Sequence, residues 1–277
     1  VGPHFGEDPL RILRAARFAA QLGFEVTDEL IEASIPVLNE LNTLPGERIW
    51  GELEKALRSP KPSLFFEALD KMGALEILFP ELVALKGRIQ PEKHHPEGDA
   101  YIHTLLVIDR ARELGADDET MFASLVHDLG KAVTPDDNLP HHYNHEALGV
   151  PLVDTLCERL KVPNDHRNAG RTAAREHLNI HKFADLKAIT KVRLLMRPGV
   201  IQGDSLINRV TLAAQADAQG RGPLFHSKPY PQRNMVLAAA EVVRGVSGHQ
   251  FATLQNGPKI AQKMEEARTK ALKIAGF

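Results

Sequence analysis

The residue pair His127-Asp128 combines two metal-ligating side chains at the predicted end of a helix. It stands in the string SLVHDLGK, where Gly130 is the expected helix stop. Neighbouring side chains on a helix diverge by about 100°, but at a helix end a long and a short side chain can turn toward the same ion. Imidazole and carboxylate together suit a divalent transition metal. We therefore expect His127 and Asp128 to bind a metal ion.

Two further residues are predicted to complete this metal site from other helices. His103, in YIHTLLVIDRA, lies on the apolar face of its helix. Asp217, in TLAAQADAQGRG, lies among alanines that would keep its carboxylate buried, where an unpaired charge is costly. A shared divalent ion such as Mn, Fe, Co, Ni or Zn would compensate these buried groups. We predict one site formed by His103, His127, Asp128 and Asp217.

Three other residues near this pattern each have two interpretations. His145 opens a predicted helix after the PHHYNH loop, and His177 closes a helix that ends in AAREHLN. Each can add a ligand to the metal, or it can be an ordinary surface or core histidine. Lys131 can meet a phosphate as a point charge, or it can end its helix in solvent. Pro151 should kink the helix after His145, which makes the position of His145 harder to predict.

Helices are the elements that must position these residues in the 277-residue chain. Apolar residues recur at helical spacing, alternating strand-like runs are nearly absent, and aromatic residues make up only 5%. Asp8, Pro9 and Gly23 mark the ends of the first helix, 9–22. The other predicted helices are 28–39, 46–58, 62–73, 101–114, 119–129, 145–160, 165–176, 185–196, 204–218, 232–245 and 257–275. We expect an all-α fold, with seams at the turn-rich segments 86–99 and 220–232.

Composition limits the class of protein. Hydrophobic residues make up 43% of the chain, which is enough for a buried core, and no stretch has the ~18 uninterrupted apolar residues of a membrane span. The single cysteine, Cys157, excludes a disulfide framework and a cysteine-based zinc site within the chain. We therefore expect a cytoplasmic globular protein with no membrane partner.

Charge is distributed unevenly, although the formal net charge is only -2. Residues 1–157 contain 14 Lys and Arg against 27 Asp and Glu, whereas residues 158–277 contain 20 against 9. The basic half can bind an anionic partner, or the two halves can neutralise each other across their contact. The basic residues that two predicted helices would offer to a phosphate backbone are Arg167, Arg171, Arg175, Lys259, Lys263, Arg268, Lys270 and Lys273.

The order of the candidate ligands resembles the HD superfamily of metal-dependent phosphohydrolases. The resemblance covers about 120 residues, from His103 through the HDLGK string to Arg221. It implies a metal, Ni²⁺ or Mg²⁺, that polarises a phosphate oxygen and activates a water for attack on phosphorus. It also implies catalytic roles for His127, Asp128 and Lys131.

The N-terminal string FGEDPLRILRAARFAAQLGF resembles the neck of class II tRNA nucleotidyltransferases, the bacterial CCA-adding enzymes. Glu7, Asp8 and Arg11 stand as EDxxR, and Arg14 and Arg17 continue the arginine spacing. The resemblance implies that Asp8 and Arg11 read the base of CTP or ATP, while Glu7 and the later arginines organise the template. Asp8 is also a sufficient helix cap, and the arginines could simply line a solvated helix face.

Later strings extend this resemblance over essentially the whole chain, among them ERIWGELEKAL, ALDKMGALEILFPEL, HHPEGDAYIHTL and RLKVPNDHRNAGRTAAREHLNIH. It divides the chain into a helical neck and body (1–86), an HD phosphohydrolase domain (87–220) and a basic helical tail (221–277). The nucleotidyltransferase head of that family carries a Gly-Gly motif and a DxD pair, and the sequence contains neither. We therefore expect no CCA addition by this chain alone, because phosphoryl transfer needs metal-held carboxylates.

The resemblance also implies a reaction and its partners. We expect 2′,3′-cyclic phosphodiesterase, 2′-nucleotidase and phosphatase activity on a tRNA 3′ end, as part of a CCA-adding enzyme that matures and repairs tRNA. The nucleotidyltransferase head of the parent polypeptide is an expected partner, and a homodimer is left open. The alternative is a tRNA-binding module whose HD region is not catalytic, resting on the basic C-terminal half.

Overall fold

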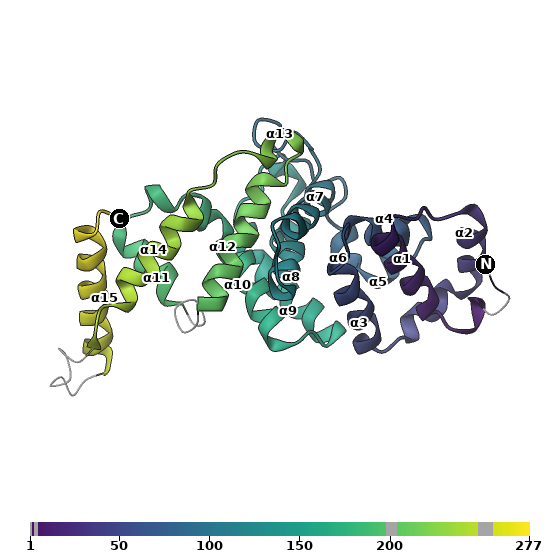
Figure 1. Cartoon of the computed structure of the whole chain (residues 1–277), viewed down its shortest axis with the longest axis horizontal. Coiled ribbons are helices and arrows are strands. Elements are labelled where there is room, and N and C mark those ends of the chain that lie inside the picture. Colours follow the sequence, from purple (N-terminus) through teal and green to yellow (C-terminus); the bar gives the residue numbers. More distant parts are fainter. Residues whose placement is uncertain (1, 3–4, 198–203, 249–256) are drawn as a thin grey trace.

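The described part of the chain is all-α in the computed structural model, which covers residues 2, 5–197, 204–248 and 257–277 (Figure 1). Within these residues, β-pairing is limited to one isolated bridge between Ile89 and Asp99. The helices follow one another along a long axis, from the N-terminal elements at one end to α15 at the other. The all-α prediction is confirmed. No helix among the described residues is long and apolar enough to cross a bilayer.

The helices fall into an N-terminal, a middle and a C-terminal group along this axis. The N-terminal group is η1 Phe5–Glu7, α1 Leu10–Leu22, α2 Asp28–Ser34, η2 Ile35–Thr43, α3 Gly46–Leu57, α4 Ser63–Lys71, α5 Leu75–Leu78 and α6 Pro80–Val83. The middle group is α7 Ala100–Glu113, α8 Asp118–Val126, η3 Leu129–Val133, η4 Asp136–Asn138, α9 His145–Leu160 and α10 Asn164–His181. The C-terminal group is η5 Phe183–Asp185, α11 Ala188–Met196, α12 Asp204–Gln219, α13 Pro223–His226, α14 Gln232–Arg244 and α15 Gly257–Ile274.

Local sequence signals explain several helix ends. Gly23 adopts a left-handed φ of 70° after the last turn of α1, as the sequence predicts. Asp99 and Asp117 accept hydrogen bonds from backbone N–H groups in the first turns of α7 and α8. Pro36 has no N–H to donate, and the predicted helix 28–39 is accordingly divided into α2 and the 3-10 helix η2.

Two helices that carry candidate ligands bear on how the site is built, and one of them, α10, runs further than the sequence suggested. Helix α9 is one continuous element that passes through Pro151. Helix α10 extends to His181 instead of ending at 176, because Ile180 continues its buried face. His181 therefore lies one turn after His177 on the same side of α10.

Two groups of buried side chains hold the helices together. One joins α1, α3 and α4 to α7, α8 and α9, and the other joins α10, α11 and α12 to α14 and α15. The helices α8 and α10 meet between the two groups. A Cβ atom at Gly170 of α10 would lie 2.8 Å from a methyl carbon of Val126, so only glycine allows this close approach. Some polar residues of the middle helices, among them His103 and His177, are enclosed by this packing.

Candidate metal centre

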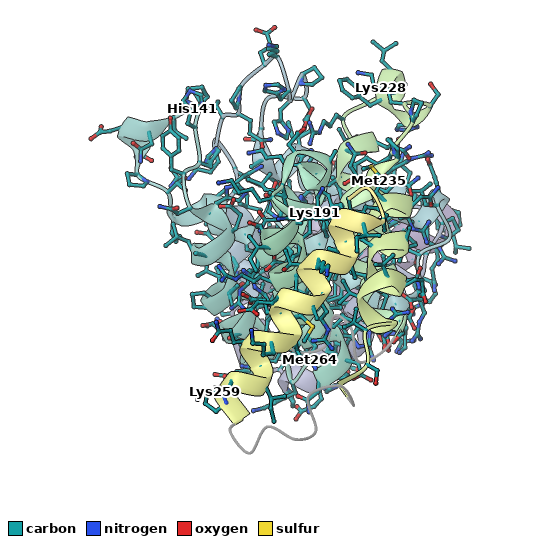
Figure 2. The ribbon with its side chains drawn as sticks, turned by 90° about the vertical axis from the view of Figure 1, so that its left-hand side faces the viewer. His141, Lys191, Lys228, Met235, Lys259 and Met264 are labelled. Carbon is teal, nitrogen blue, oxygen red and sulfur yellow. The ribbon has the colours of Figure 1, made fainter. Side chains whose placement is uncertain are left out.

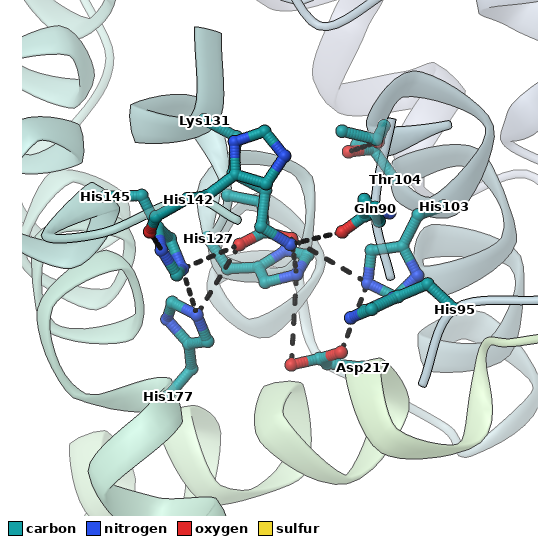
Figure 3. A network of polar contacts seen from close by, with 12 residues as sticks. Gln90, His95, His103, Thr104, His127, Lys131, His142, His145, His177 and Asp217 are labelled. Carbon is teal, nitrogen blue, oxygen red and sulfur yellow. Dashed lines mark hydrogen bonds and ion pairs between the residues drawn. The ribbon is translucent and has the colours of Figure 1, made fainter. Parts of the chain in front are cut away.

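Five segments of the chain bring the candidate ligands to one buried point (Figure 3). The segments are α7 with His103, the end of α8 with His127 and Asp128, the start of α9 with His145, α10 with His177, and α12 with Asp217. Each of these residues is at most 5% exposed. The structure therefore brings together all six residues that the sequence analysis assigned to a metal, including the two with alternative interpretations.

One side of Asp128 faces His145 and His177. Asp128 Oδ1 lies 3.4 Å from His145 Nε2 and 3.5 Å from His177 Nε2, and the two ring nitrogens are 3.1 Å apart. Ligand atoms about 2.1 Å from one ion, at angles of about 90–110°, are roughly 3.0–3.4 Å from one another. The three atoms thus form a triangle of the size that a single ion requires.

Backbone carbonyls select the tautomers of these two rings. His145 Nδ1 donates to His142 O at 2.6 Å, and His177 Nδ1 donates to Ala173 O at 3.0 Å. In the neutral tautomer that results, each Nε2 carries a lone pair directed at the other ring. Burial lowers the pKa of His177 to about 3, so this ring is neutral at pH 7. Facing lone pairs repel, and a cation held by these two rings and the Asp128 carboxylate would remove the repulsion.

The other side of Asp128 faces His103 and His127. Asp128 Oδ2 lies 3.2 Å from His127 Nε2 and 3.8 Å from His103 Nε2. Asp217 closes this group, with Oδ1 3.1 Å from His103 Nε2 and Oδ2 4.0 Å from His127 Nε2. His127 Nδ1 donates to Ser124 O at 2.8 Å, which directs its Nε2 inward as well. Asp128 therefore offers one carboxylate oxygen to each pair of histidines.

The two carboxylates affect the charge of His127. Burial alone would lower its pKa, but the charges of Asp128 and Asp217 outweigh burial and raise the pKa above its ordinary value. A proton on His127 can therefore compensate the carboxylates in the metal-free protein. A divalent ion would displace that proton, as ligand histidines bind metals in the neutral form.

Asp128 keeps its negative charge inside the protein. Burial opposes the charged form, yet His127 and Lys131 lower the pKa of Asp128 well below its usual range. The Lys131 ammonium donates to Asp128 Oδ2 and to Gln90 Oε1. A lysine has three donors, so one N–H of Lys131 is left for a ligand. The buried position of Lys131, 6% exposed, differs from the solvated helix end that was one of its two interpretations.

Three residues that the sequence analysis did not assign surround Asp217. His181 Nε2 lies 2.6 Å from Asp217 Oδ2, and His181 Nδ1 lies 2.8 Å from the hydroxyl of Tyr230. Arg221 donates to Asp217 Oδ1 at 3.1 Å. Despite burial, His181 and Arg221 lower the pKa of Asp217 well below its usual range. Spacing could have identified two of them, because His181 follows His177 and Arg221 follows Asp217 by four residues on a helix.

Glu97 was also missed, and it contacts the outer nitrogen of His103. Its Oε1 lies 2.7 Å from His103 Nδ1 and 2.9 Å from His95 Nδ1, and its side chain is 4% exposed. Burial opposes its charge, but the bonds with both rings lower the pKa of Glu97 to about 2. A carboxylate on Nδ1 directs the Nε2 lone pair of His103 toward the other ligands. The residue lies in the turn-rich segment 86–99, which has no periodicity that could have indicated its direction.

A cavity of about 580 Å³ opens beside the centre. Lys131, His145, His181 and Arg221 are among the residues that line it, so groups next to the candidate ligands face the cavity. Its volume is in the range of sites that hold small molecules, about 300–1,000 Å³. A small molecule can therefore approach the centre from this side.

The predicted template residues lie apart from this centre, in η1, in α1 and in the short link between them at the N-terminal end (Figure 1). Asp8 Oδ1 accepts a hydrogen bond from the backbone N–H of Leu10 at 3.0 Å, and Asp8 Oδ2 pairs with Arg48 at 2.9 Å. Glu7 and Arg11 form an ion pair at 3.6 Å. The side chains of Asp8 and Arg11 remain about one-third exposed, at 36% and 35%.

The two later arginines of the same motif have different surroundings. Arg14 is exposed. Arg17 is 12% exposed, and its Nε pairs with Glu52 Oε2 at 2.7 Å while its guanidinium lies over the ring of Phe18. Arg17 therefore already has a carboxylate partner inside the N-terminal group, whereas Arg14 faces solvent.

Two protein families match successive parts of the chain, the first within the N-terminal group of helices and the second over the helices that carry the candidate ligands. The family described as "Probable RNA and SrmB- binding site of polymerase A" matches residues 23–85, and the family described as "HD domain" matches residues 100–218. The HD match contains all six candidate ligands. It ends one residue after Asp217.

Solved structures of CCA-adding enzymes share this fold. The complex of a CCA-adding enzyme with CTP has a TM-score of 0.53 and 13% sequence identity, and the likeness covers 97% of this chain and 56% of that chain. The complex with ATP has a TM-score of 0.56 and 13% identity, covering 96% of this chain and 57% of that chain. The chain thus spans less than two thirds of the length of these solved enzymes.

Curated relatives are more similar in sequence. A multifunctional CCA protein from Nitrosococcus oceani is 43% identical over 99% of this chain and 68% of the relative. The proteins of the same name from Vibrio vulnificus and Methylococcus capsulatus are each 41% identical over 99% of this chain, and the match covers 69% and 66% of their lengths. With relatives of this identity over 99% of its length and matches to the two families in this order, the chain belongs to the family of multifunctional CCA proteins.

Proposed function

We propose that this chain is the phosphohydrolase part of a cytoplasmic CCA-adding enzyme and that its HD centre hydrolyses phosphoesters at tRNA 3′ ends. The substrates would be 2′,3′-cyclic phosphates, 2′-phosphates and other phosphomonoesters, whose removal would prepare the 3′ end for CCA addition. The triangle of His145 Nε2, His177 Nε2 and Asp128 Oδ1 carries the proposal, because its edges of 3.1–3.5 Å fit the ligands of one ion.

The donor set favours two neighbouring metal positions over the single one predicted from the sequence. One would be held by His145, His177 and Asp128, and the other by His103, His127, Asp128 and Asp217. Nitrogen and carboxylate donors suit Ni²⁺ and also allow Mg²⁺ through the carboxylates. When bound, such an ion polarises a phosphoryl oxygen and makes a water acidic enough to attack phosphorus at neutral pH.

The residues of the chain would orient the phosphoester at this centre. Lys131 and Arg221 line the cavity, and each is held by a carboxylate, Asp128 for the lysine and Asp217 for the arginine. Their remaining N–H groups can donate hydrogen bonds to the oxygens of a phosphate. Hydrolysis adds the water oxygen to phosphorus and breaks one P–O bond, and the released sugar oxygen takes a proton. A cyclic substrate would therefore open to a monoester.

The other parts of the chain would serve the complete enzyme. Residues 1–86 would act as neck and body, 87–220 as the HD domain and 221–277 as a basic tail, with tRNA as ligand. Asp8 and Arg11 would face CTP or ATP held by a nucleotidyltransferase head, supported by Glu7 and Arg14, while the ion pair of Arg17 with Glu52 favours a positioning role for Arg17. One chain supplies all six candidate metal ligands, so the proposed hydrolysis does not depend on a homodimer.

A tRNA-binding module without hydrolase activity is the second candidate function. The match of residues 23–85 to an RNA-binding family favours it, as does the basic C-terminal half. However, two of the arginines expected to bind phosphates already have a partner. Arg167 Nε lies 2.7 Å and Arg171 Nη1 2.9 Å from Asp154 Oδ1. RNA binding can accompany hydrolysis, and it would not account for the arrangement of the histidines.

Hydrolysis of 2′,3′-cyclic AMP tests the proposal. We expect the purified chain, freed of metal and resupplied with Ni²⁺ or Mg²⁺, to open the cyclic phosphate. Asp128→Ala should abolish the reaction while circular dichroism shows an unchanged helical content, because both sets of ligands use this carboxylate. His226→Ala, which removes a histidine of α13 outside the centre, is the control. Undiminished hydrolysis by Asp128→Ala would assign the reaction to another site or to a contaminant.

A further inference from the structure

An aromatic pair lies at the rim of the cavity beside the metal centre. The rings of His141 and Tyr143 are stacked, with centroids 5.6 Å apart and an interplanar angle of 26°. Both residues are exposed, and 62% of Tyr143 is accessible, although a ring of this size gains free energy by burial. Both also line the cavity. The pair is therefore an aromatic surface that faces the approach to the centre.

The loop that carries the two rings is held from its inner side. His142, between them in sequence, donates from Nε2 to Ile89 O at 3.0 Å, and its Nδ1 lies 2.7 Å from Thr134 Oγ1. His145, two residues after Tyr143, is buried among the metal ligands. Because His142 and His145 are fixed inward, the rings of His141 and Tyr143 remain outside. Figure 2 shows His141 on a loop that stands away from the helices.

The rings are close enough to the centre to share one small ligand with it. Only Asn144 separates Tyr143 from His145 in sequence, so the Cα atoms of Tyr143 and His145 are at most about 7 Å apart. The cavity also presents the cations of Lys131 and Arg221. A ligand whose phosphate meets these cations can therefore place its opposite end over the Tyr143 ring.

We propose that His141 and Tyr143 stack the nucleobase of the nucleotide whose phosphate lies at the metal centre. This inference rests on the proposed function and adds to it the residues that would hold the base of the terminal nucleotide. Every base has a π-face, so stacking on an aromatic surface tolerates different bases. The centre therefore selects for the presence of a base, not for its identity.

A pair of substrates with and without a base tests the role of the rings. We compare kcat/KM for adenosine 2′-phosphate with kcat/KM for glycerol 2-phosphate, which has no ring. Tyr143→Ala should lower the ratio of the two values by roughly 5- to 150-fold, the range of base–aromatic stacking. Tyr143→Phe, which keeps the ring, should restore it. Cytidine 2′-phosphate should show a loss similar to that of adenosine 2′-phosphate.

Phe24→Ala is the matched control, because Phe24 is 63% exposed and lies at the N-terminal end, beyond α1. It should keep the wild-type ratio. Equal losses on both substrates in Tyr143→Ala, or no loss on either, would overturn the stacking role and leave the proposed hydrolase intact.

If the wild type hydrolyses neither substrate, the proposed hydrolase activity is refuted. A binding measurement then tests the stacking role of the rings by itself. A 2-aminopurine riboside 2′-phosphate is then titrated with metal-free chain, since the fluorescence of this base falls when it stacks. Quenching by the wild type that is lost in Tyr143→Ala and kept in Tyr143→Phe would support the stacking surface. Equal quenching by all three proteins would refute it.

Discussion

The hydrogen bond made by one ring nitrogen of each buried histidine decides whether the other nitrogen is free to bind a metal. His127, His145 and His177 each place Nδ1 against a backbone carbonyl, so their Nε2 atoms are left to face Asp128. His103 differs, because a carboxylate, Glu97, occupies the position that a carbonyl has in the others. Such outer partners fix the orientation of a ligand and increase its basicity.

Glu97 should therefore strengthen metal binding without contacting the metal. We expect Glu97→Ala to weaken Ni²⁺ binding by about 10- to 100-fold, the usual effect of losing an outer partner. Glu97→Gln keeps an oxygen acceptor for His103 and should recover part of the affinity. Isothermal titration measures both, with Glu92→Ala, an exposed residue of the same loop, as the control. A dissociation constant unchanged in Glu97→Ala would contradict this role.

The clustering of the candidate ligands was predictable at this scale, and their outer partners were not. His103, His127 and Asp217 lie within apolar helical patterns, where an inward polar residue is conspicuous. Glu97 lies in an irregular segment, which has no helical or strand periodicity from which the direction of its side chain could be predicted. The burial of Lys131 could not be predicted from its position at a helix end either, because it depends on contacts with Gln90 and Asp128.

At the scale of the helices, a close backbone contact joins the segment that follows Asp128 to the start of α9, which carries His145. A Cβ atom at Gly130 would lie 1.9 Å from His145 O and 2.6 Å from Gly149 N. This contact holds the segment after Asp128 against the start of α9. It therefore keeps Asp128 next to His145.

Gly130→Ala should consequently affect both stability and metal binding. We expect the free energy of unfolding to fall by about 1–3 kcal/mol, because α9 must shift away from the added methyl group. Ni²⁺ binding should weaken in the same variant. Gly51→Ala is the matched control, since open space surrounds that position in α3 and alanine favours a helix. Denaturant unfolding measures the difference, and equal stability of Gly130→Ala and wild type would contradict the proposed contact.

The N-terminal helices depend on a buried ion pair between α1 and α3. Glu52 is 7% exposed and accepts bonds from Arg17 and Lys55. Burial favours its protonated form, but these two partners outweigh burial and lower the pKa of Glu52 below 4.5. A depressed pKa stabilises the fold fully above the unfolded value of 4.5, and this stability is lost as the pH falls through the folded value.

Glu52→Gln should thus lower the free energy of unfolding at pH 7 by about 1.5–3 kcal/mol, the usual contribution of hydrogen bonds to a charged group. The difference in the free energy of unfolding between wild type and variant should narrow as the pH falls below 4.5. Urea unfolding at several pH values measures this difference. A difference that stays constant from pH 7 down to pH 3 would show that the charge of Glu52 does not stabilise the fold.

Helix positions were largely predictable because their signals are local. The αL glycine at Gly23 ends α1 where the sequence places its end. The end of α10 was placed too early, since the polar stretch around His177 hides the buried Ile180 that continues the helix. Tertiary packing decided that helix end, and with it the position of His181.

Over the whole molecule, the basic residues of the C-terminal half are not all available to RNA. Arg167 and Arg171 pair with Asp154, whereas Lys270 and Lys273 lie exposed on α15. A phosphate contact releases counterions, so each contact adds to the salt dependence of binding. Exposed lysines should therefore contribute more to RNA binding than arginines that already have a carboxylate partner.

A comparison of two double variants tests this distinction. We expect tRNA binding to weaken as salt rises, and replacement of Lys270 and Lys273 by alanine should reduce the slope of log K against log salt by about 0.7–0.9 per lysine. Replacement of Arg167 and Arg171 by alanine should change the slope less. Fluorescence anisotropy at several salt concentrations measures both slopes. A larger change in the arginine variant would place the RNA on α10 instead of α15.

The metal content of the whole chain tests the shared role of Asp128 most directly. Wild-type chain dialysed against Ni²⁺ should retain two ions per chain by elemental analysis, because each oxygen of Asp128 faces its own pair of histidines. His177→Ala should retain one ion and Asp128→Ala none, whereas Asp136→Ala, an exposed aspartate outside the centre, should match the wild type. An Asp128→Ala chain that keeps the wild-type metal content would contradict a centre built around this carboxylate.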